Sequence, residues 1–413
     1  MKSRNCLLNI DLLNMNAMKK WMFTRYVCAL LLLPILATAQ KQERQIGDTT
    51  YYKTLIPETK QSLLKNVSMI ANMNFALRNE FVDGEYTQTR FRNEQFRLEI
   101  RGKVHDKVYF RFRDRYTRAQ TSESIDNLSR SVDLAYIRID ATDKLSISAG
   151  KLCADWGAFE FDYNPIDIYE YSDIIEYADN FLTGVGVSYT ASSKHQYTIQ
   201  ILDSRTKTFE ELYGQQPNFT ESKAPLAFVA NWRGNLFDGK VKTIWSYALH
   251  TEATNAFMHY IALGTELTLG KFVVAYDFKW SDEDLDRTGI VSETVPDNLY
   301  PYALGNTLYI GHWVHAHYRV TEKINLSLFG MVDFAKWMSE GVDTQKNTDD
   351  IRTAYGFIPV VEYYPWNDLN LRFFVNYVGR IYDYSSYAES RFEASDYNTG
   401  RFTVGFVTPL GIF

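Results

Sequence analysis

The sequence has little cysteine, little proline and no long hydrophobic run after its N-terminus. Cys6 and Cys28 lie in an N-terminal segment that reads as removable, so Cys153 alone remains and an intrachain disulfide is excluded. Proline accounts for 10 of 413 residues and charged residues for 23%, which is not the composition of a disordered chain. The longest apolar run, residues 26–39, has about 14 residues, whereas a membrane-spanning helix needs about 20. We therefore expect no helix to cross a bilayer.

The N-terminus has the features of a secretory signal. Lys19 and Lys20 precede the apolar run, and Ala37-Thr38-Ala39 forms a small-residue cleavage site before Gln40. The sequence predicts a signal peptide over residues 1–39, with Met18 as the start. A polar periplasmic segment, residues 40–66, is expected to follow.

The charge and the aromatic content narrow the class further. Residues 1–39 carry five Lys or Arg and one Asp, so their removal takes the net charge from −6 to about −10. An acidic chain makes nucleic acid an unsuitable partner. Aromatic residues make up 15% of the sequence although the mean hydropathy is only −0.30. This combination is typical of strands in which apolar and polar residues alternate.

Such alternation extends from residue 67 to the end of the chain. In one example, Phe373, Val375 and Tyr377 alternate with polar Arg372 and Asn376. We count about 16 such segments, of a length that suits tilted spanning strands. The predicted strands are 67–82, 88–103, 106–118, 130–141, 144–151, 182–191, 195–203, 225–234, 240–250, 256–268, 271–281, 306–320, 323–335, 351–364, 368–383 and 398–413.

The connections between these strands alternate in length. Short turns separate mostly long connections at 119–129, 152–181, 204–224, 282–305, 336–350 and 384–397. Outer-membrane barrels have short periplasmic turns and long external loops. Closure also pairs every backbone group inside hydrocarbon. The sequence therefore predicts an all-β fold, a transmembrane antiparallel β-barrel over residues 67–413 with polar groups facing a wet interior.

Arginine is concentrated on the inward face of a few strands that closure brings together. Guanidinium stays charged and grips carboxylate or phosphate, so a cationic wall would favour anions. The alternative is that these arginines only pair with lumen acids such as Glu80 and Glu99. The predicted wall comprises Arg78, Arg97, Arg101, Arg111, Arg113, Arg115, Arg372, Arg380 and Arg401.

The longest loop, 152–181, is acidic, has no Lys, Arg or His after Lys151, and is apolar between its acids. We expect it to fold into the barrel as a constriction loop and to oppose the arginine wall, which would create a transverse field that orients solutes. The alternative is a surface loop that makes a subunit contact or binds calcium. The candidate constriction acids are Asp155, Glu160, Asp162, Asp167, Glu170 and Asp173.

Catalytic and cofactor motifs are missing. The sequence contains no phosphate-binding glycine loop, nucleophile elbow or paired-cysteine motif. His315 and His317 share an inward face, but lining the lumen is the simpler interpretation than metal binding. We therefore predict no enzyme activity, no catalytic residues, no cofactor and no metal site.

Three short motifs follow one another between residues 133 and 160. They read Asp133-Leu134-Ala135-Tyr136-Ile137-Arg138-Ile139-Asp140, Gly150-Lys151 and Trp156-Gly157-Ala158-Phe159-Glu160. Together they resemble the phosphate-selective porin O/P family, and more closely its members in Bacteroidetes-type bacteria. The end of the chain, Gly405 to Phe413, is similar to the assembly signal of outer-membrane barrels. The resemblance implies a porin of 16 strands, often a trimer, that passes small anions.

The resulting expectation is an outer-membrane porin for passive diffusion of small hydrophilic solutes or ions, with a possible preference for anions or phosphate. Its expected location is the outer membrane of a Gram-negative bacterium. Lipid bilayer with lipopolysaccharide and copies of itself in a homotrimer are the expected partners. One alternative is a substrate-selective oligosaccharide channel, with Tyr109, Tyr260, Tyr309 and Trp313 stacking on sugars. Another is a non-conducting barrel that serves as a surface adhesin or enzyme scaffold.

Overall fold

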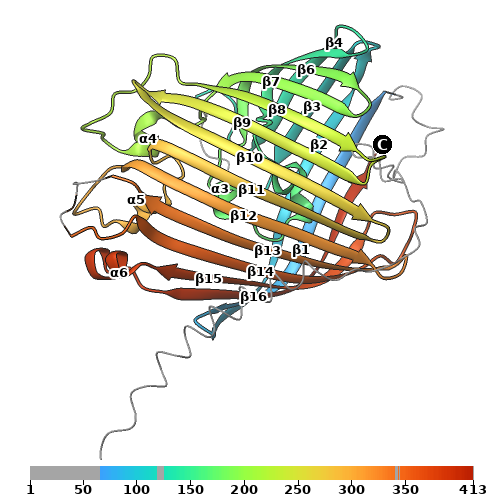
Figure 1. Ribbon diagram of the computed structural model, residues 1–413. Coiled ribbons are helices and arrows are strands. Elements are labelled where there is room, and N and C mark those ends of the chain that lie inside the picture. Colours follow the sequence, from blue (N-terminus) through green and yellow to red (C-terminus); the bar gives the residue numbers. More distant parts are fainter. Residues whose placement is uncertain (1–65, 119–124, 340–342, 344, 413) are drawn as a thin grey trace, which may run out of the picture. The chain divides into compact units, whose positions relative to one another are not determined.

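The computed structural model describes residues 66–118, 125–339, 343 and 345–412. In these residues sixteen strands form a closed antiparallel barrel (Figure 1). Each strand pairs with its neighbours in sequence, and β1 closes the barrel against β16 from Ile70↔Gly411 to Val82↔Thr399. The predicted fold class is therefore confirmed. The predicted signal peptide, 1–39, and all but one residue of segment 40–66 lie outside the described residues.

The strands follow the chain in the order of their labels. They are β1 Val67–Val82, β2 Glu85–His105, β3 Val108–Arg115, β4 Val132–Asp140, β5 Leu145–Cys153, β6 Phe181–Ser192, β7 His195–Asp203, β8 Leu226–Leu236, β9 Val241–Ala253, β10 Ala256–Leu269, β11 Phe272–Leu285, β12 Gly305–Arg319, β13 Ile324–Trp337, β14 Asp350–Tyr363, β15 Arg372–Tyr384 and β16 Tyr397–Gly411.

The helices of the described residues are short and lie in the long connections. They are α2 Phe159–Asp162, η2 Pro165–Asp167, α3 Asp173–Glu176, α4 Phe209–Tyr213, α5 Ile290–Thr294 and α6 Ser386–Phe392. The labels α4, α5 and α6 lie at one end of the barrel, on the left in Figure 1. None of the helices in the described residues is long and apolar enough to cross a membrane.

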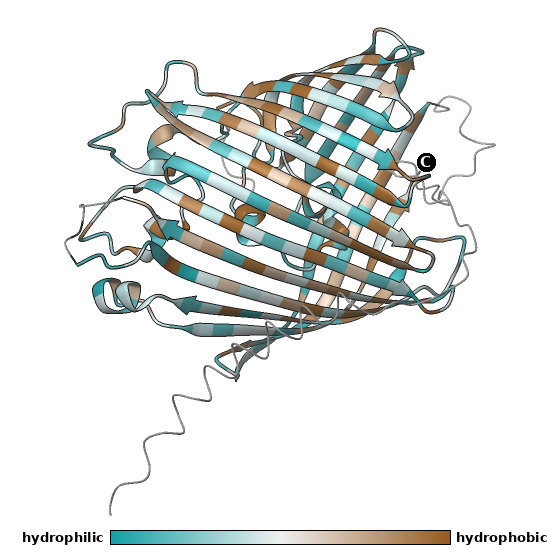
Figure 2. Ribbon diagram, in the orientation of Figure 1, coloured by the Kyte–Doolittle hydropathy of each residue, from teal (hydrophilic) through white to brown (hydrophobic). Residues whose placement is uncertain are grey.

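The outer face of the strands is mostly apolar and the inner face carries polar side chains, as alternation with a period of two requires. Along β15, Phe373, Val375 and Tyr377 are exposed on the outside, while Arg372 and Asn376 are buried inside. Figure 2 shows hydrophobic and hydrophilic residues alternating along the strands. In a barrel that spans a membrane, the outer residues meet lipid and need no protein partner.

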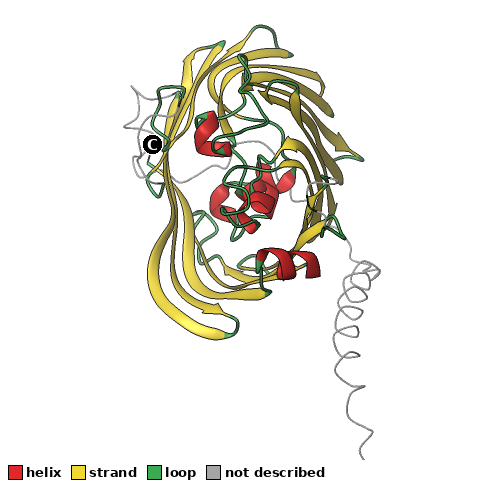
Figure 3. Cartoon of the chain, turned by 90° about the vertical axis from the view of Figure 1, so that its left-hand side faces the viewer, coloured by secondary structure: helices red, strands yellow, loops and turns green. Residues whose placement is uncertain are grey.

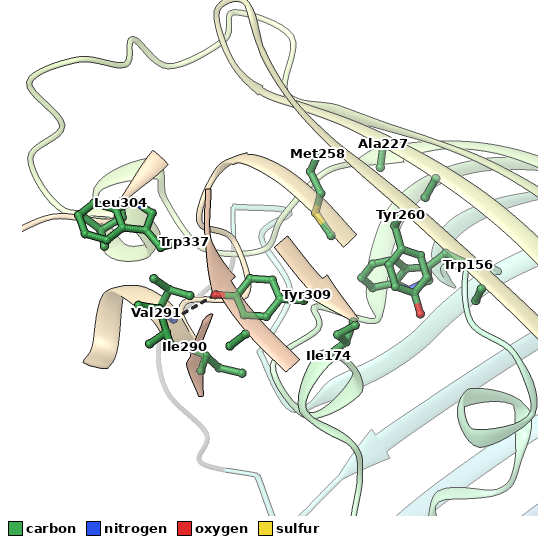
Figure 4. Close-up of a cluster of buried hydrophobic side chains, with 14 of the residues drawn as sticks. Trp156, Ile174, Ala227, Met258, Tyr260, Ile290, Val291, Leu304, Tyr309 and Trp337 are labelled. Carbon is green, nitrogen blue, oxygen red and sulfur yellow. Dashed lines mark hydrogen bonds between the residues drawn. The ribbon is translucent and has the colours of Figure 1, made fainter. Parts of the chain in front are cut away.

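The interior differs from the expected polar lining on the β9–β14 side. Inward-facing Tyr260, Tyr309 and Trp337 are at most 1% exposed and belong to a buried cluster with Trp156 and Ile174 of the β5–β6 connection (Figure 4). The expectation of a wet interior was therefore wrong on this side. An inserted loop supplies apolar partners that period-two reasoning on single strands does not include.

This packing also removes most of the aromatic residues named for sugar stacking. Tyr260 is 0% exposed, and Tyr309 and Trp313 are each 1% exposed. A sugar ring cannot stack on an aromatic face that is already covered by protein. Those three assignments were wrong.

Candidate functional site

The β5–β6 connection, residues 154–180 and here called the inserted loop, turns into the barrel. It carries α2, η2 and α3, and Figure 3 shows helical turns inside the ring of strands. Its apolar residues Trp156, Phe159, Ile166 and Ile174 are only 1–3% exposed. The loop therefore buries its own apolar side chains by occupying part of the lumen.

Two carboxylates fasten the first part of the loop to β11. Glu160 forms an ion pair with Lys279 and accepts hydrogen bonds from the Ser172 backbone N–H at 2.6 Å and its hydroxyl at 2.7 Å. Asp277 accepts hydrogen bonds from the backbone N–H groups of Phe159 at 3.1 Å and Glu160 at 2.7 Å. Because these groups are almost fully buried, each charge depends on its partners.

The loop also lies close to β10 at Gly264. A Cβ atom added there would lie 2.8 Å from Ala158 Cβ and 2.9 Å from Phe159 Cδ2. A larger residue would collide with these loop side chains, so glycine leaves the room that they need.

All six predicted constriction acids are ion-paired to barrel strands. Asp155 and Asp162 contact Arg233 at 2.6 and 2.8 Å. The other pairs are Glu160 with Lys279, Asp167 with Arg372 at 2.5 Å, Glu170 with Arg401 at 2.9 Å, and Asp173 with both Arg352 and Arg380, the latter at 2.6 Å. Three of these cations, Arg233, Lys279 and Arg352, were not among the predicted site residues. The signal that could have identified them is their inward position on strands in which apolar and polar residues alternate.

The predicted arginine wall divides into two groups and one separate residue, Arg78. Arg372, Arg380 and Arg401 hold loop acids directly, so no gap separates opposite charges there. Arg78 pairs instead with Glu80 at 2.9 Å and Glu94 at 3.1 Å. The remaining five make up what we call the arginine cluster: Arg97, Arg101, Arg111, Arg113 and Arg115, on β2 and β3.

The arginine cluster is organised around two carboxylates. Asp133 on β4 is 0% exposed and contacts Arg97 at 3.5 Å, Arg113 at 3.3 Å and Arg115 at 2.7 Å. Glu99 contacts Arg101 at 3.4 Å, Arg111 at 3.0 Å and Arg113 at 3.9 Å. Three guanidinium groups around Asp133 leave a local excess of positive charge. Asp133 was not predicted as a site residue, although it begins one of the motifs that carry the family resemblance.

A cavity of about 380 Å³ lies between the arginine cluster and the inserted loop. Arg97, Arg115 and Arg401 contribute from the strands, and Tyr171 and Glu176 contribute from the loop. The other lining residues are Asn74, Glu94, Gln95, Ile168, Tyr169, Glu170, Phe374, Asn376 and Thr403. The strands involved are β1, β2, β3, β15 and β16. The cavity therefore lies beside the loop and not on the filled β9–β14 side.

Glu176 differs from the other acids of this cavity. It has no ion-pair or hydrogen-bond partner among the residues that the structure describes, and its side chain is exposed in the cavity. The protein around the cavity desolvates the carboxylate and raises the pKa of Glu176, and the nearby carboxylate of Glu170 raises it further, while Arg115 opposes both effects. Protonation at a higher pH than usual is the consequence.

The described residues contain no group of three or more His, Cys, Asp or Glu side chains that could hold a metal ion. His315 stacks on Phe329, with ring centroids 3.9 Å apart. The histidine pair thus lies in aromatic surroundings.

The closed barrel has the architecture of outer-membrane channels, and solved structures share it. The outer membrane channel DcaP of Acinetobacter baumannii superposes with a TM-score of 0.58 at 11% identity, over 83% of this chain and 97% of that one. Salmonella typhi OmpF in complex with daunomycin gives a TM-score of 0.50 at 11% identity, over 83% and 98%. None of the curated proteins matches the sequence.

The family follows from the sequence itself. The model of the family "Phosphate-selective porin O and P" matches residues 72–406, so the chain belongs to that family. The predicted resemblance is confirmed. The protein is an outer-membrane β-barrel channel, and its family and fold imply a channel rather than an enzyme.

Proposed function

We propose that the protein lets small hydrophilic solutes and ions diffuse passively across the outer membrane of a Gram-negative bacterium, with anions preferred over cations. The observation that supports this most directly is the cavity beside the inserted loop, with Arg97 and Arg115 of the arginine cluster in its wall. Cationic groups lining a pore favour anions. The path runs between the inserted loop and strands β1–β3, β15 and β16.

The inserted loop would set the width of this path. Its six acids are each held by a strand cation, so the loop is fixed at several points along its length. A fixed loop narrows the lumen in a constant manner. The acids would act mainly as anchors, because their charge is compensated locally.

Conductance in a planar bilayer tests this function. We expect purified protein to give steady single-channel currents, and a reversal potential in a salt gradient that indicates anion preference. Absence of current would favour the alternative of a non-conducting surface adhesin or enzyme scaffold. Current with cation preference would contradict the role given to the arginine cluster.

We also propose a homotrimer. Strand β3 has 8 residues and β4 and β5 have 9 each, at or below the 9–11 that a tilted spanning strand needs. Contact with a neighbouring subunit would cover these short strands, which would otherwise face lipid. Light scattering of the detergent-solubilised protein, corrected for detergent mass, distinguishes a trimer from a monomer.

A further inference from the structure

The cavity combines groups of opposite charge on different elements. Arg97 and Arg115 lie on β2 and β3, and their shared carboxylate, Asp133, also serves Arg113. Glu176 lies on α3 of the inserted loop, exposed in the same cavity. A solute in this space meets guanidinium groups from the barrel wall and a loop carboxylate that has no ion-pair partner within the described residues.

The neutral polar side chains of the cavity wall offer a solute little. Asn74, Asn376 and Thr403 are only 3–4% exposed, and their side-chain oxygens Asn74 Oδ1, Asn376 Oδ1 and Thr403 Oγ1 are buried. The charged side chains of the wall are therefore what a solute meets.

The guanidinium groups of the strands supply the positive side of the cavity. Arg115 lines the cavity beside Arg97; its Nη2 lies 2.7 Å from Asp133, and its side chain is 21% exposed. A solute carboxylate in the cavity would be attracted to this partly exposed guanidinium group. The cavity thus has a cationic wall on β2 and β3 and a carboxylate on α3.

We infer that the passage favours zwitterionic solutes, such as amino acids and very short peptides, over neutral solutes of the same size. The solute carboxylate lies toward Arg97 and Arg115, and its ammonium group lies toward Glu176. Oppositely charged groups orient a dipolar solute and lower the cost of dehydrating both of its ends. This inference rests on the proposed diffusion function and names its solute class.

Liposome swelling with the purified protein tests the inference. The probes are diglycine, a neutral sugar alcohol of similar size, and the potassium salt of a small sugar acid. We expect diglycine to enter about fivefold faster than the alcohol, which corresponds to about 1 kcal/mol. Equal rates for diglycine and the alcohol, in liposomes that do swell, would overturn the inference while leaving the diffusion function standing. No swelling with any probe would overturn the diffusion function itself.

The variant Glu176→Gln tests the contribution of the carboxylate separately from that of the arginine residues. It keeps the shape of the side chain and removes its charge, so the advantage of diglycine should fall to about twofold or less while entry of the sugar acid stays the same or rises. Glu389→Gln on α6 is the matched control, because Glu389 is an exposed loop acid outside the cavity. An unchanged diglycine advantage in Glu176→Gln, or an equal loss in Glu389→Gln, would contradict the inference.

Discussion

Cations meet carboxylates differently on two sides of the barrel. On β8, β11 and β14–β16, six cations pair with the six acids of the inserted loop. On β2 and β3, by contrast, the arginine cluster shares Glu99 and Asp133. Compensated pairs fix a loop in place, whereas a cluster with excess positive charge keeps a field in the adjoining cavity. The same residue type thus acts as an anchor on one side and as a source of potential on the other.

Deletion of residues 160–175 should have the largest effect, because it removes most of the anchored loop and leaves the arginine cluster in place. We expect single-channel conductance to rise about two- to threefold, since a barrel of this strand number otherwise leaves a wide aqueous lumen. Circular dichroism would establish that the barrel still forms. Unchanged conductance in a folded variant would show that the loop does not limit the path.

Lys279→Met tests a single anchor on the compensated side. Removing one partner of a buried ion pair costs about 3–5 kcal/mol, because it leaves Glu160 charged and unpaired. We expect the loop to detach locally, with frequent transitions to a higher conductance level. The double variant Lys279→Met with Glu160→Gln should recover part of the steady current, because no charge is then left unpaired. Steady wild-type current in Lys279→Met alone would contradict the anchoring role.

Replacement of Arg111, Arg113 and Arg115 by alanine tests the excess charge on the other side. We expect the anion-over-cation permeability ratio to fall about fivefold, in line with roughly 1 kcal/mol for a charge at close range in water. Conductance should change much less, because the loop anchors stay intact. The matched triple variant Arg352, Arg372 and Arg380 to alanine should instead change conductance and its noise. Indistinguishable behaviour of the two triple variants would remove the distinction between the two sides.

A fall in pH gives the smallest effect and sharpens the comparison within the cavity. The pKa of Glu176 is raised, first by burial and then by Glu170, so its charge is lost at a higher pH than for an ordinary glutamate. Loss of a negative charge beside the arginine cluster should increase anion preference as the pH is lowered, by less than about 1 kcal/mol. Reversal potentials in a pH series measure this change. The series should be flat over the same interval for Glu176→Gln, and an equal response there would assign the titration to another group.

Much of the fold could be predicted from alternation alone. The predicted strand 195–203 coincides with β7, and 67–82 coincides with β1. The inward position of Arg97, Glu99 and Arg113 followed from the same period of two. Local backbone geometry places every second residue on one face, so a single strand contains this information.

The partners of the charged residues could not be predicted in the same way. Asp173 meets Arg352 and Arg380, which lie about two hundred residues away in sequence, and Glu160 meets Lys279. These contacts depend on the position of each inward residue along the barrel axis and on the path of the loop inside the barrel. Neither is encoded in the pattern of one segment.

The sequence by itself determined a closed barrel with an apolar outside, because alternation and the need to pair every backbone group leave few other arrangements. It also determined that inward arginines and loop acids would be available to each other. Only the tertiary structure decided which charges neutralise one another, where the loop fills the lumen with buried aromatic side chains, and which space stays open beside Arg97, Arg115 and Glu176. Those outcomes depend on three-dimensional distances between distant strands, and charge interactions change steeply with such distances.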